Sequence, residues 1–254
     1  MQLQRNSFKQ ALAASRLQIG LWCSLASNIA AEIVADSGFD WLLLDSEHAP
    51  NEIPGLLSQL QAVTRGPAAP VVRVAWNDLV MIKRALDIGA QSLLVPLVDN
   101  AEQAQRAVRA TCFPPRGNRG VAGGTRATNF GRIDDYLIKA SEEICVVVQA
   151  ETRGALDRIE EIAKVEGVDG VFIGPNDLAA SLGHTGDTRH PDVQKAIEDA
   201  ARRLRAAGKA AGILAFQEEE ARRYIGWGYS FVAVGGDVAL LANGADALAK
   251  KFKG

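Results

Sequence analysis

The sequence is poor in cysteine and lacks the spacing that cysteine-based sites require. Its three cysteines are Cys23, Cys112 and Cys145, and no C-x-x-C pair occurs. An odd count with such wide spacing argues against a disulfide framework and against a zinc site. We therefore expect a reduced, cytoplasmic protein in which the three thiols serve as small buried hydrophobic groups.

Long apolar runs and clusters of basic charge are also missing. Residues 1–16 are polar and charged, without the apolar stretch of a secretory signal. No run of about 20 apolar residues is present that could span a membrane. The formal net charge is −2, and the Lys and Arg residues are scattered, which disfavours binding to nucleic acid. We expect neither a membrane nor a nucleic acid as a partner.

The motifs of several enzyme classes are absent as well. The chain has no P-loop, no G-x-G-x-x-G after a predicted strand and no G-x-S-x-G. Phosphoryl transfer, nicotinamide chemistry and serine hydrolysis therefore lose support. A Schiff-base aldolase needs a lysine where a barrel strand ends, whereas Lys209 stands at the beginning of a predicted strand.

What the sequence does contain is a regular alternation of short apolar runs and helical segments. Near-continuous apolar strands separated by helices indicate parallel βα units. A chain of 254 residues with eight such units is typical of one (β/α)₈ barrel, an α/β TIM barrel, with residues 1–254 as a single domain. The predicted strands are Gln18–Ser24, Trp41–Asp45, Val71–Ala75, Ser92–Leu97, Ile144–Ala150, Gly170–Ile173, Lys209–Leu214 and Phe231–Val234.

Every second strand is preceded by the same phrase: a helix end, a glycine and one or two further residues. Glycine at this point fits a left-handed helix C-cap. The phrase comes before the second, fourth, sixth and eighth strands, which indicates a weak two-unit repeat. The glycines are Gly38, Gly89, Gly167 and Gly228.

The connection between the fourth and fifth strands, residues 112–132, is unusually long. It is rich in glycine and contains Pro114, Pro115 and several arginines. A loop of this length in a compact domain is usually a lid or a binding loop, or else disordered. We expect a lid.

Acidic and amide side chains gather where the predicted strands end, which is where barrel enzymes keep their active sites. Because side chains alternate along a strand, Asp45 and Glu47 share one face, and so do Gln149 and Glu151. Carboxylates that converge on one pocket repel each other unless a cation lies among them. Oxygen ligands of this kind are typical of Mg²⁺ or Mn²⁺. We predict Glu151 and Asp177 as metal ligands.

The segment Gly174–Leu178 opens a helix directly after the sixth strand. Free backbone N–H groups at a helix start attract anions, so a substrate carboxylate could bind the amides of Asn176 and Asp177. The alternative is an ordinary capped helix.

Three further side chains are candidates for chemistry. His48 follows an acidic strand end and could act as a general base. Arg73 lies on an otherwise apolar strand and must meet an anion, either a structural carboxylate or a substrate oxyanion. Asp87 lies in the last turn of a predicted helix, where its charge opposes the helix dipole. Because this position of Asp87 costs stability, we expect Asp87 to have a functional role, for example orienting His48.

Taken in order, these motifs resemble those of the HpcH/HpaI aldolase family over nearly the whole chain, from about residue 20 to residue 248. The blocks that carry the resemblance are Leu44-Asp45-Ser46-Glu47-His48, Val72-Arg73-Val74, Pro114-Pro115-Arg116-Gly117, Gln149-Ala150-Glu151-Thr152 and Phe172-Ile173-Gly174-Pro175-Asn176-Asp177-Leu178.

The resemblance implies a class II pyruvate aldolase that needs a divalent cation, Mg²⁺, Mn²⁺ or Co²⁺. Such an enzyme reversibly cleaves 4-hydroxy-2-keto acids to pyruvate, or hydroxypyruvate, and an aldehyde through a metal-bound enolate. It implies that Glu151 and Asp177 bind the metal and that Arg73 binds substrate and stabilises the enolate. His48 would be the catalytic histidine and Asp87 the acid paired with it.

The resemblance also implies supporting roles and an assembly. Gln149 would lie near metal and substrate, Leu214 would form an apolar wall of the pocket, and Asp45 and Glu47 would support the ligands from behind. The family forms hexamers, trimers of dimers that exchange C-terminal helices, and the apolar tail Val238–Leu248 is compatible with that. An oxaloacetate-type decarboxylase, a citryl-CoA-type lyase and a non-catalytic keto-acid-binding barrel remain as alternatives.

Overall fold

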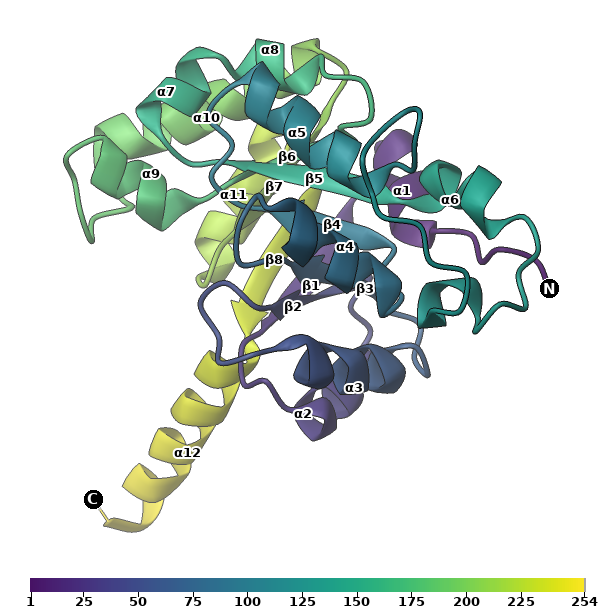
Figure 1. Ribbon diagram of the computed structural model, residues 1–254. Coiled ribbons are helices and arrows are strands. Elements are labelled where there is room, and N and C mark those ends of the chain that lie inside the picture. The colour runs from purple at the N-terminus through teal and green to yellow at the C-terminus, as the bar shows by residue number, and fades with distance from the viewer. Residues whose placement is uncertain (254) are drawn as a thin grey trace.

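The computed structural model, which describes residues 1–253, is a closed barrel of eight parallel strands. Each strand pairs with the next along the chain, and β8 closes onto β1 (Figure 1). The predicted (β/α)₈ fold is confirmed. The strands are β1 (Gln18–Cys23), β2 (Trp41–Asp45), β3 (Ala69–Arg73), β4 (Ser92–Val95), β5 (Cys145–Ala150), β6 (Gly170–Ile173), β7 (Ala210–Leu214) and β8 (Phe231–Gly236).

Helices surround the barrel and return the chain from the end of one strand to the start of the next. A short 3₁₀ helix, η1 (Arg126–Thr128), lies in the long connection. The α-helices are α1 (Ser7–Ala13), α2 (Asn28–Ala35), α3 (Ile53–Val63), α4 (Leu79–Asp87), α5 (Ala101–Thr111), α6 (Tyr136–Glu143), α7 (Arg153–Asp157), α8 (Ile159–Ala163), α9 (Pro175–Ser181), α10 (Pro191–Ala206), α11 (Glu218–Trp227) and α12 (Asp237–Lys253).

The repeated glycine motif predicted from the sequence forms turns before β2, β4, β6 and β8. Gly38, Gly89, Gly167 and Gly228 have φ angles of 89°, 97°, 90° and 107°. Side chains with a Cβ rarely adopt this left-handed region, so glycine lets the chain leave a helix and enter β2, β4, β6 or β8 at once. Gly228 caps α11 and Gly89 follows the cap residue of α4, as predicted, whereas Gly38 and Gly167 lie three and four residues after the ends of α2 and α8.

The barrel interior is filled with large apolar side chains, and α1 closes its N-terminal end. The ring of Phe8 lies 5.6 Å from that of Trp41 and 5.8 Å from that of Phe231, measured between centroids. Gly212 makes room for this packing, because a Cβ there would lie 2.0 Å from the Phe231 ring. The end of the barrel where the strands begin is therefore plugged. We call the opposite end, where the strands end, the mouth.

The long connection, residues 112–132, lies at the plugged end and not at the mouth. It follows the C-terminus of α5 and leads, through α6, into the start of β5 (Figure 1). Its Arg119 is 1% exposed, lies 2.8 Å from a carboxylate oxygen of Asp87 and stacks over Phe113. The expected lid over the chain's own mouth is wrong, because this connection enters a strand, whereas mouth loops leave one.

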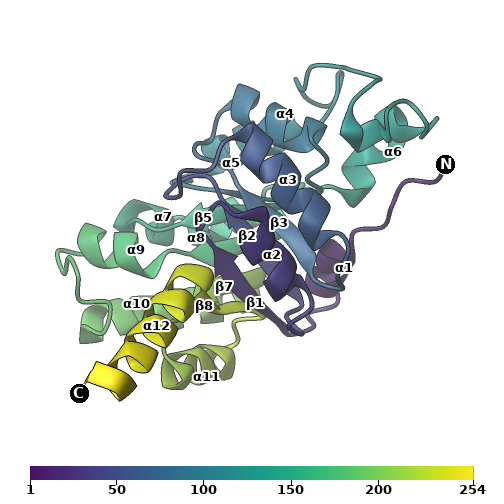
Figure 2. The same cartoon turned by 90° about the horizontal axis from the view of Figure 1, so that it is seen from below.

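Helix α12 projects away from the barrel as a single long element (Figure 2). Asp237, its first residue, is its one buried side chain within residues 237–253. Leu240, Leu241, Leu248 and Phe252 are all exposed. In residues 1–253 no helix combines the length and apolarity that crossing a membrane would require.

Candidate active site

The mouth has two acidic sides, and the side built by β2 and β3 contains a neutralised pair. Asp45, the last residue of β2, is 1% exposed. Arg73, the last residue of β3, donates from Nε to one carboxylate oxygen at 2.8 Å and from Nη2 to the other at 2.7 Å. Burial opposes ionisation of Asp45, but the hydrogen bonds and charge of Arg73 outweigh it, so the pKa of Asp45 is held below its usual value.

Arg73 is held by more than Asp45. Its Nη1 lies 2.8 Å from Oε2 of Glu47, and its guanidinium lies 4.8 Å from the centre of the Trp22 ring. The sequence left open whether Arg73 meets a structural carboxylate or a substrate oxyanion, and the structure shows two carboxylates of the protein around it. The charge of Arg73 is thus shared within the β2–β3 side.

On the other side of the mouth, β5 carries an acid with no cation beside it. Glu151 follows the strand directly, is 2% exposed, and accepts hydrogen bonds from the Leu97 amide at 2.9 Å and from the Gln149 side chain. Burial raises the pKa of Glu151 to about 7, the nearby charges of Asp177 and Glu47 add to this, and the two hydrogen bonds only partly offset it. A carboxyl group that needs a proton near neutrality is one that a cation would stabilise.

The chain approaches Glu151 closely at Gly174, which precedes α9. A Cβ at this position would lie 2.4 Å from Oε2 of Glu151 and 3.0 Å from the Gln149 side-chain nitrogen. Glycine therefore lets the start of α9 come against the buried acid. Asn176 and Asp177 lie in the first turn of α9 and are exposed, and amides at this point of a helix have no intrahelical acceptor.

Two buried acceptor atoms in the mouth have no hydrogen-bond donor. They are Oε1 of Gln149 and Oε2 of Glu47, the latter at ion-pair distance from Arg73 but without hydrogen-bond geometry. Buried polar atoms are normally satisfied, so the unpaired Gln149 oxygen beside the buried Glu151 indicates a missing positive group. The donor set of carboxylate and amide oxygens fits Mg²⁺, Mn²⁺ or a similar divalent cation.

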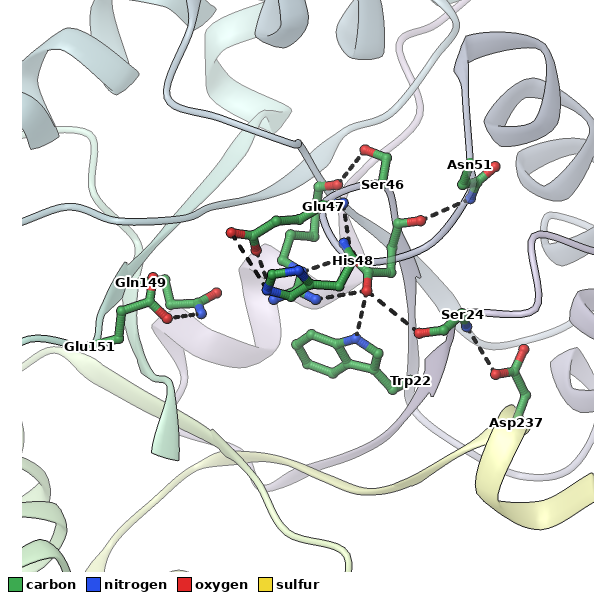
Figure 3. A network of polar contacts seen from close by, with 11 residues as sticks. Trp22, Ser24, Ser46, Glu47, His48, Asn51, Gln149, Glu151 and Asp237 are labelled. Atoms are coloured by element: carbon green, nitrogen blue, oxygen red, sulfur yellow. Dashed lines mark hydrogen bonds and ion pairs between the residues drawn. The ribbon is translucent and has the colours of Figure 1, made fainter. Parts of the chain in front are cut away.

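His48 is the most exposed of the predicted catalytic residues. Its side chain is 68% exposed, and Nε2 lies 4.0 Å from Oε1 of Glu47. Figure 3 shows Glu47 and His48 reaching over the mouth toward Gln149 and Glu151. A histidine in this position can exchange protons with both solvent and a bound molecule.

Leu214, the last residue of β7, is half-buried and packs against the aromatic core of the barrel. It is therefore at the level of the mouth, as an apolar wall residue would be.

Asp87 does not join this group within the chain. It ends α4, which leads into the start of β4, so it belongs to the plugged end of the barrel and pairs with Arg119. The predicted pairing with His48 is wrong within one chain, because His48 follows the end of a strand. The unfavourable helix position of Asp87 is explained instead by the buried arginine beside it.

Sequence reasoning missed part of the network on the β1 side. The Trp22 indole nitrogen donates to Asp45 at 3.3 Å, and the Ser24 hydroxyl lies 3.5 Å from the same oxygen. Asp237, the first residue of α12, accepts from the Ser24 amide at 2.9 Å (Figure 3). A tryptophan and a serine at the end of the first strand were the available signal, but neither residue type alone indicates a site.

Comparison with known proteins agrees with the geometry. The family model described as HpcH/HpaI aldolase/citrate lyase matches residues 18–244. The chain is 56% identical, over 97% of its length and 94% of the relative's, to a 4-hydroxy-2-oxo-heptane-1,7-dioate aldolase of Klebsiella pneumoniae. It is 58% identical to a pyruvate aldolase of Rhizobium etli, with 99% of each chain covered.

A solved structure has the same fold. A HpcH/HpaI aldolase/citrate lyase family protein from Burkholderia cenocepacia superposes with a TM-score of 0.95 at 43% identity, covering 98% of this chain and 100% of the other.

Proposed function

We propose a reaction for this site from one premise: the chain belongs to the HpcH/HpaI aldolase/citrate lyase family. It is an aldolase, an enzyme that forms or breaks a carbon–carbon bond. The proposed reaction is reversible cleavage of a 4-hydroxy-2-keto acid to pyruvate, or hydroxypyruvate, and an aldehyde. The observation that carries it is Glu151, a buried acid without a cation, facing the mouth beside an orphaned amide oxygen.

Glu151 and Asp177 would hold a divalent cation, Mg²⁺, Mn²⁺ or Co²⁺, with the oxygen of Gln149 close by. When bound, such a cation acts as a Lewis acid that stabilises negative charge on a substrate oxygen. The close approach of Gly174 to Glu151 supports this assignment, because it brings the first turn of α9 to the same acid.

Arg73 would add positive charge on the opposite side as an enolate forms. Asp45 and Glu47 fix its guanidinium, so little reorganisation is needed when substrate arrives. His48, exposed beside Glu47, would take the proton from the 4-hydroxyl group during cleavage and return it during condensation.

The remaining predicted residues would position the substrate. The substrate carboxylate would bind at the amides of Asn176 and Asp177, and Leu214 would border the methyl or hydroxymethyl end of the keto acid. We assign no role to Asp87 within its own chain.

For the physiological substrate we propose 4-hydroxy-2-oxoheptanedioate, on which the Klebsiella relative is named to act. We further propose a hexamer, a trimer of dimers that exchange α12. The exposed Leu240, Leu241, Leu248 and Phe252 support the exchange, because a second copy would cover them.

The test is pyruvate release from 4-hydroxy-2-oxoheptanedioate with EDTA and then with Mg²⁺, Mn²⁺ or Co²⁺ restored. We expect activity to vanish with EDTA and to return with metal. Asp177→Asn should lower the metal-dependent rate by about 10³-fold or more, since the cation contributes several kcal/mol.

Glu102→Gln is the matched control, because Glu102 is also a first-turn acid but lies on α5 with its side chain 86% exposed. It should keep the wild-type rate. Activity that survives EDTA and is lost on borohydride treatment would overturn the proposal. Turnover of oxaloacetate without cleavage of the hydroxy acid would instead favour the decarboxylase, and binding without product would favour a non-catalytic barrel.

A further inference from the structure

We propose that His184, His190 and Asp192 form a second metal site, for a transition-metal cation of the Zn²⁺ type, on the loop between α9 and α10. In residues 1–253 this is the one group of three or more His, Cys, Asp or Glu side chains with ligand atoms all within 4.8 Å of one another. The acids of the mouth do not form such a group. The proposal does not rest on the proposed reaction, because it involves none of the mouth residues.

The two histidine nitrogens lie at similar distances from one carboxylate oxygen. Nε2 of His184 lies 3.5 Å and Nδ1 of His190 lies 3.8 Å from Oδ2 of Asp192. Bonds of 2.0–2.2 Å in a tetrahedral zinc site place neighbouring ligand atoms about 3.4 Å apart. To bind one ion, the stacked imidazole rings would have to turn so that both nitrogens point at it, with the fourth position left to water.

The loop between α9 and α10 already holds the two histidines together. The amide of Asp187 donates to the carbonyl of His184 at 2.9 Å, and the amide of His190 donates to the carbonyl of Asp187 at 3.3 Å. The imidazole rings stack with centroids 3.4 Å apart. Because these turns fix the loop, metal binding would not have to order it first, and the ordering cost would be small.

The same loop is accessible from solvent. The side chains of His184 and His190 are 25% and 34% exposed, and that of Asp192 is 72% exposed. Figure 1 shows the α9–α10 connection at the outer edge of the molecule. An ion can therefore reach these three side chains without passing the mouth.

The ligand set selects the kind of metal. Two imidazoles and one carboxylate suit Zn²⁺, Co²⁺, Ni²⁺ or Cu²⁺, whereas Mg²⁺ prefers oxygen ligands only. The residues proposed to hold the cation in the mouth, Glu151, Asp177 and Gln149, would bind it through oxygen atoms. The two sites would thus differ in metal preference, with the loop taking the softer cation.

A simpler use of His190 is to cap α10. Its Nδ1 accepts from the Asp192 amide at 3.3 Å, which is long for such a bond. Capping accounts for His190 but not for His184, whose Nε2 lies 3.5 Å from the same carboxylate. Metal binding would replace this weak cap by a stronger bond to the same nitrogen.

The test is zinc binding by the full-length chain, measured by calorimetry, beside the variant His184→Gln/His190→Gln. We expect the wild type to bind one more equivalent of Zn²⁺ than the variant, whatever the mouth binds. Removing a residue that hydrogen-bonds a metal ligand typically lowers metal affinity about 10- to 100-fold. Because His190 would be a ligand itself, His190→Gln should lower zinc affinity by at least about 100-fold.

Asp187→Asn is the matched control, because Asp187 belongs to the same loop but is not one of the three proposed ligands. It should bind as many equivalents as the wild type. A second measurement is independent of variants: crystals soaked in Zn²⁺ should give an anomalous peak between the three ligand atoms. Equal stoichiometry in wild type and double variant, or no peak at this place, would overturn the proposal.

Discussion

The two sides of the mouth each contain a buried acid where a strand ends, yet the pKa values of the two acids are shifted in opposite directions. On the β2–β3 side, Asp45 is paired with Arg73, and its pKa is held below the usual value. On the β5–β6 side, Glu151 has no cation, and burial raises its pKa to about 7. A buried acid at a strand end is therefore a stable carboxylate on the side that contains Arg73, and on the other side it is an acid that a cation would stabilise.

On one side the protein supplies the positive charge itself, and on the other the charge would come from a bound cation. The β2–β3 side contains its own counter-charge, Arg73. The β5–β6 side leaves an amide oxygen without a donor and brings Asp177 close to Glu151. A divalent cation would supply the β5–β6 side with the positive charge that Arg73 supplies on the β2–β3 side.

The largest expected effect comes from replacing the uncompensated acid. Glu151→Gln should abolish metal-dependent cleavage, a loss of about 10³-fold or more. It should also stabilise the metal-free protein at pH 8. The folded-state pKa of Glu151 lies above its unfolded value, so its contribution is fully present below pH 4.5 and is lost as pH rises to about 7.

A shift from 4.5 to about 7 corresponds to roughly 3 kcal/mol, an order-of-magnitude figure. The free energy of unfolding of metal-free wild type should fall by up to that amount across this pH range, and the variant should not show the fall. Urea unfolding at pH 5 and pH 8 in EDTA measures it. Identical pH dependence in both proteins would mean that Glu151 is not the strained acid.

Replacing Arg73, the cation of the β2–β3 side, should lower the free energy of unfolding. Arg73→Met leaves the buried Asp45 without its counter-charge, which we expect to cost about 3–5 kcal/mol of unfolding free energy. Arg65→Met is the control, because Arg65 pairs with Glu32 at the surface and should cost no more than about 1 kcal/mol. If both variants unfold at the same urea concentration, Asp45 does not depend on Arg73.

A smaller effect should follow from filling the space beside Glu151. In Gly174→Ala the new methyl group would meet the Glu151 carboxylate, and we expect metal affinity to fall by about 10- to 100-fold. Gly226→Ala, where no atom lies within 4 Å, should leave affinity unchanged. Measuring cleavage activity as a function of metal concentration gives the affinity of each variant. Unchanged affinity in Gly174→Ala would argue that Glu151 is not a ligand.

The smallest effect on catalysis is expected at Asp87. Asp87→Asn should weaken the ion pair with buried Arg119 and lower stability by about 1–3 kcal/mol. The pH profile of cleavage, which reports His48, should stay in place, since the two residues do not meet within the chain. A shifted profile would mean that Asp87 reaches the His48 of another copy.

The fold and one half of the site could be predicted from the sequence because both depend on local patterns. Strand alternation placed Gln149 and Glu151 on one face, and the glycine phrase marked the starts of four strands. The partner of Arg73, the contact between Asp87 and Arg119 and the place of residues 112–132 depend on contacts between distant segments. The clustering of His184 with Asp192 likewise depends on loop turns, which the hydrophobic periodicity of the sequence does not predict.

The central claim is that a divalent cation completes the β5–β6 side of the mouth. The most direct test is Mn²⁺ binding followed by electron paramagnetic resonance, in the His184→Gln/His190→Gln background so that only the mouth is counted. We predict one bound ion, with affinity that weakens as pH falls below about 7 because protons compete for Glu151, and no binding after Glu151→Gln. Undiminished Mn²⁺ binding in the Glu151→Gln variant would contradict the account.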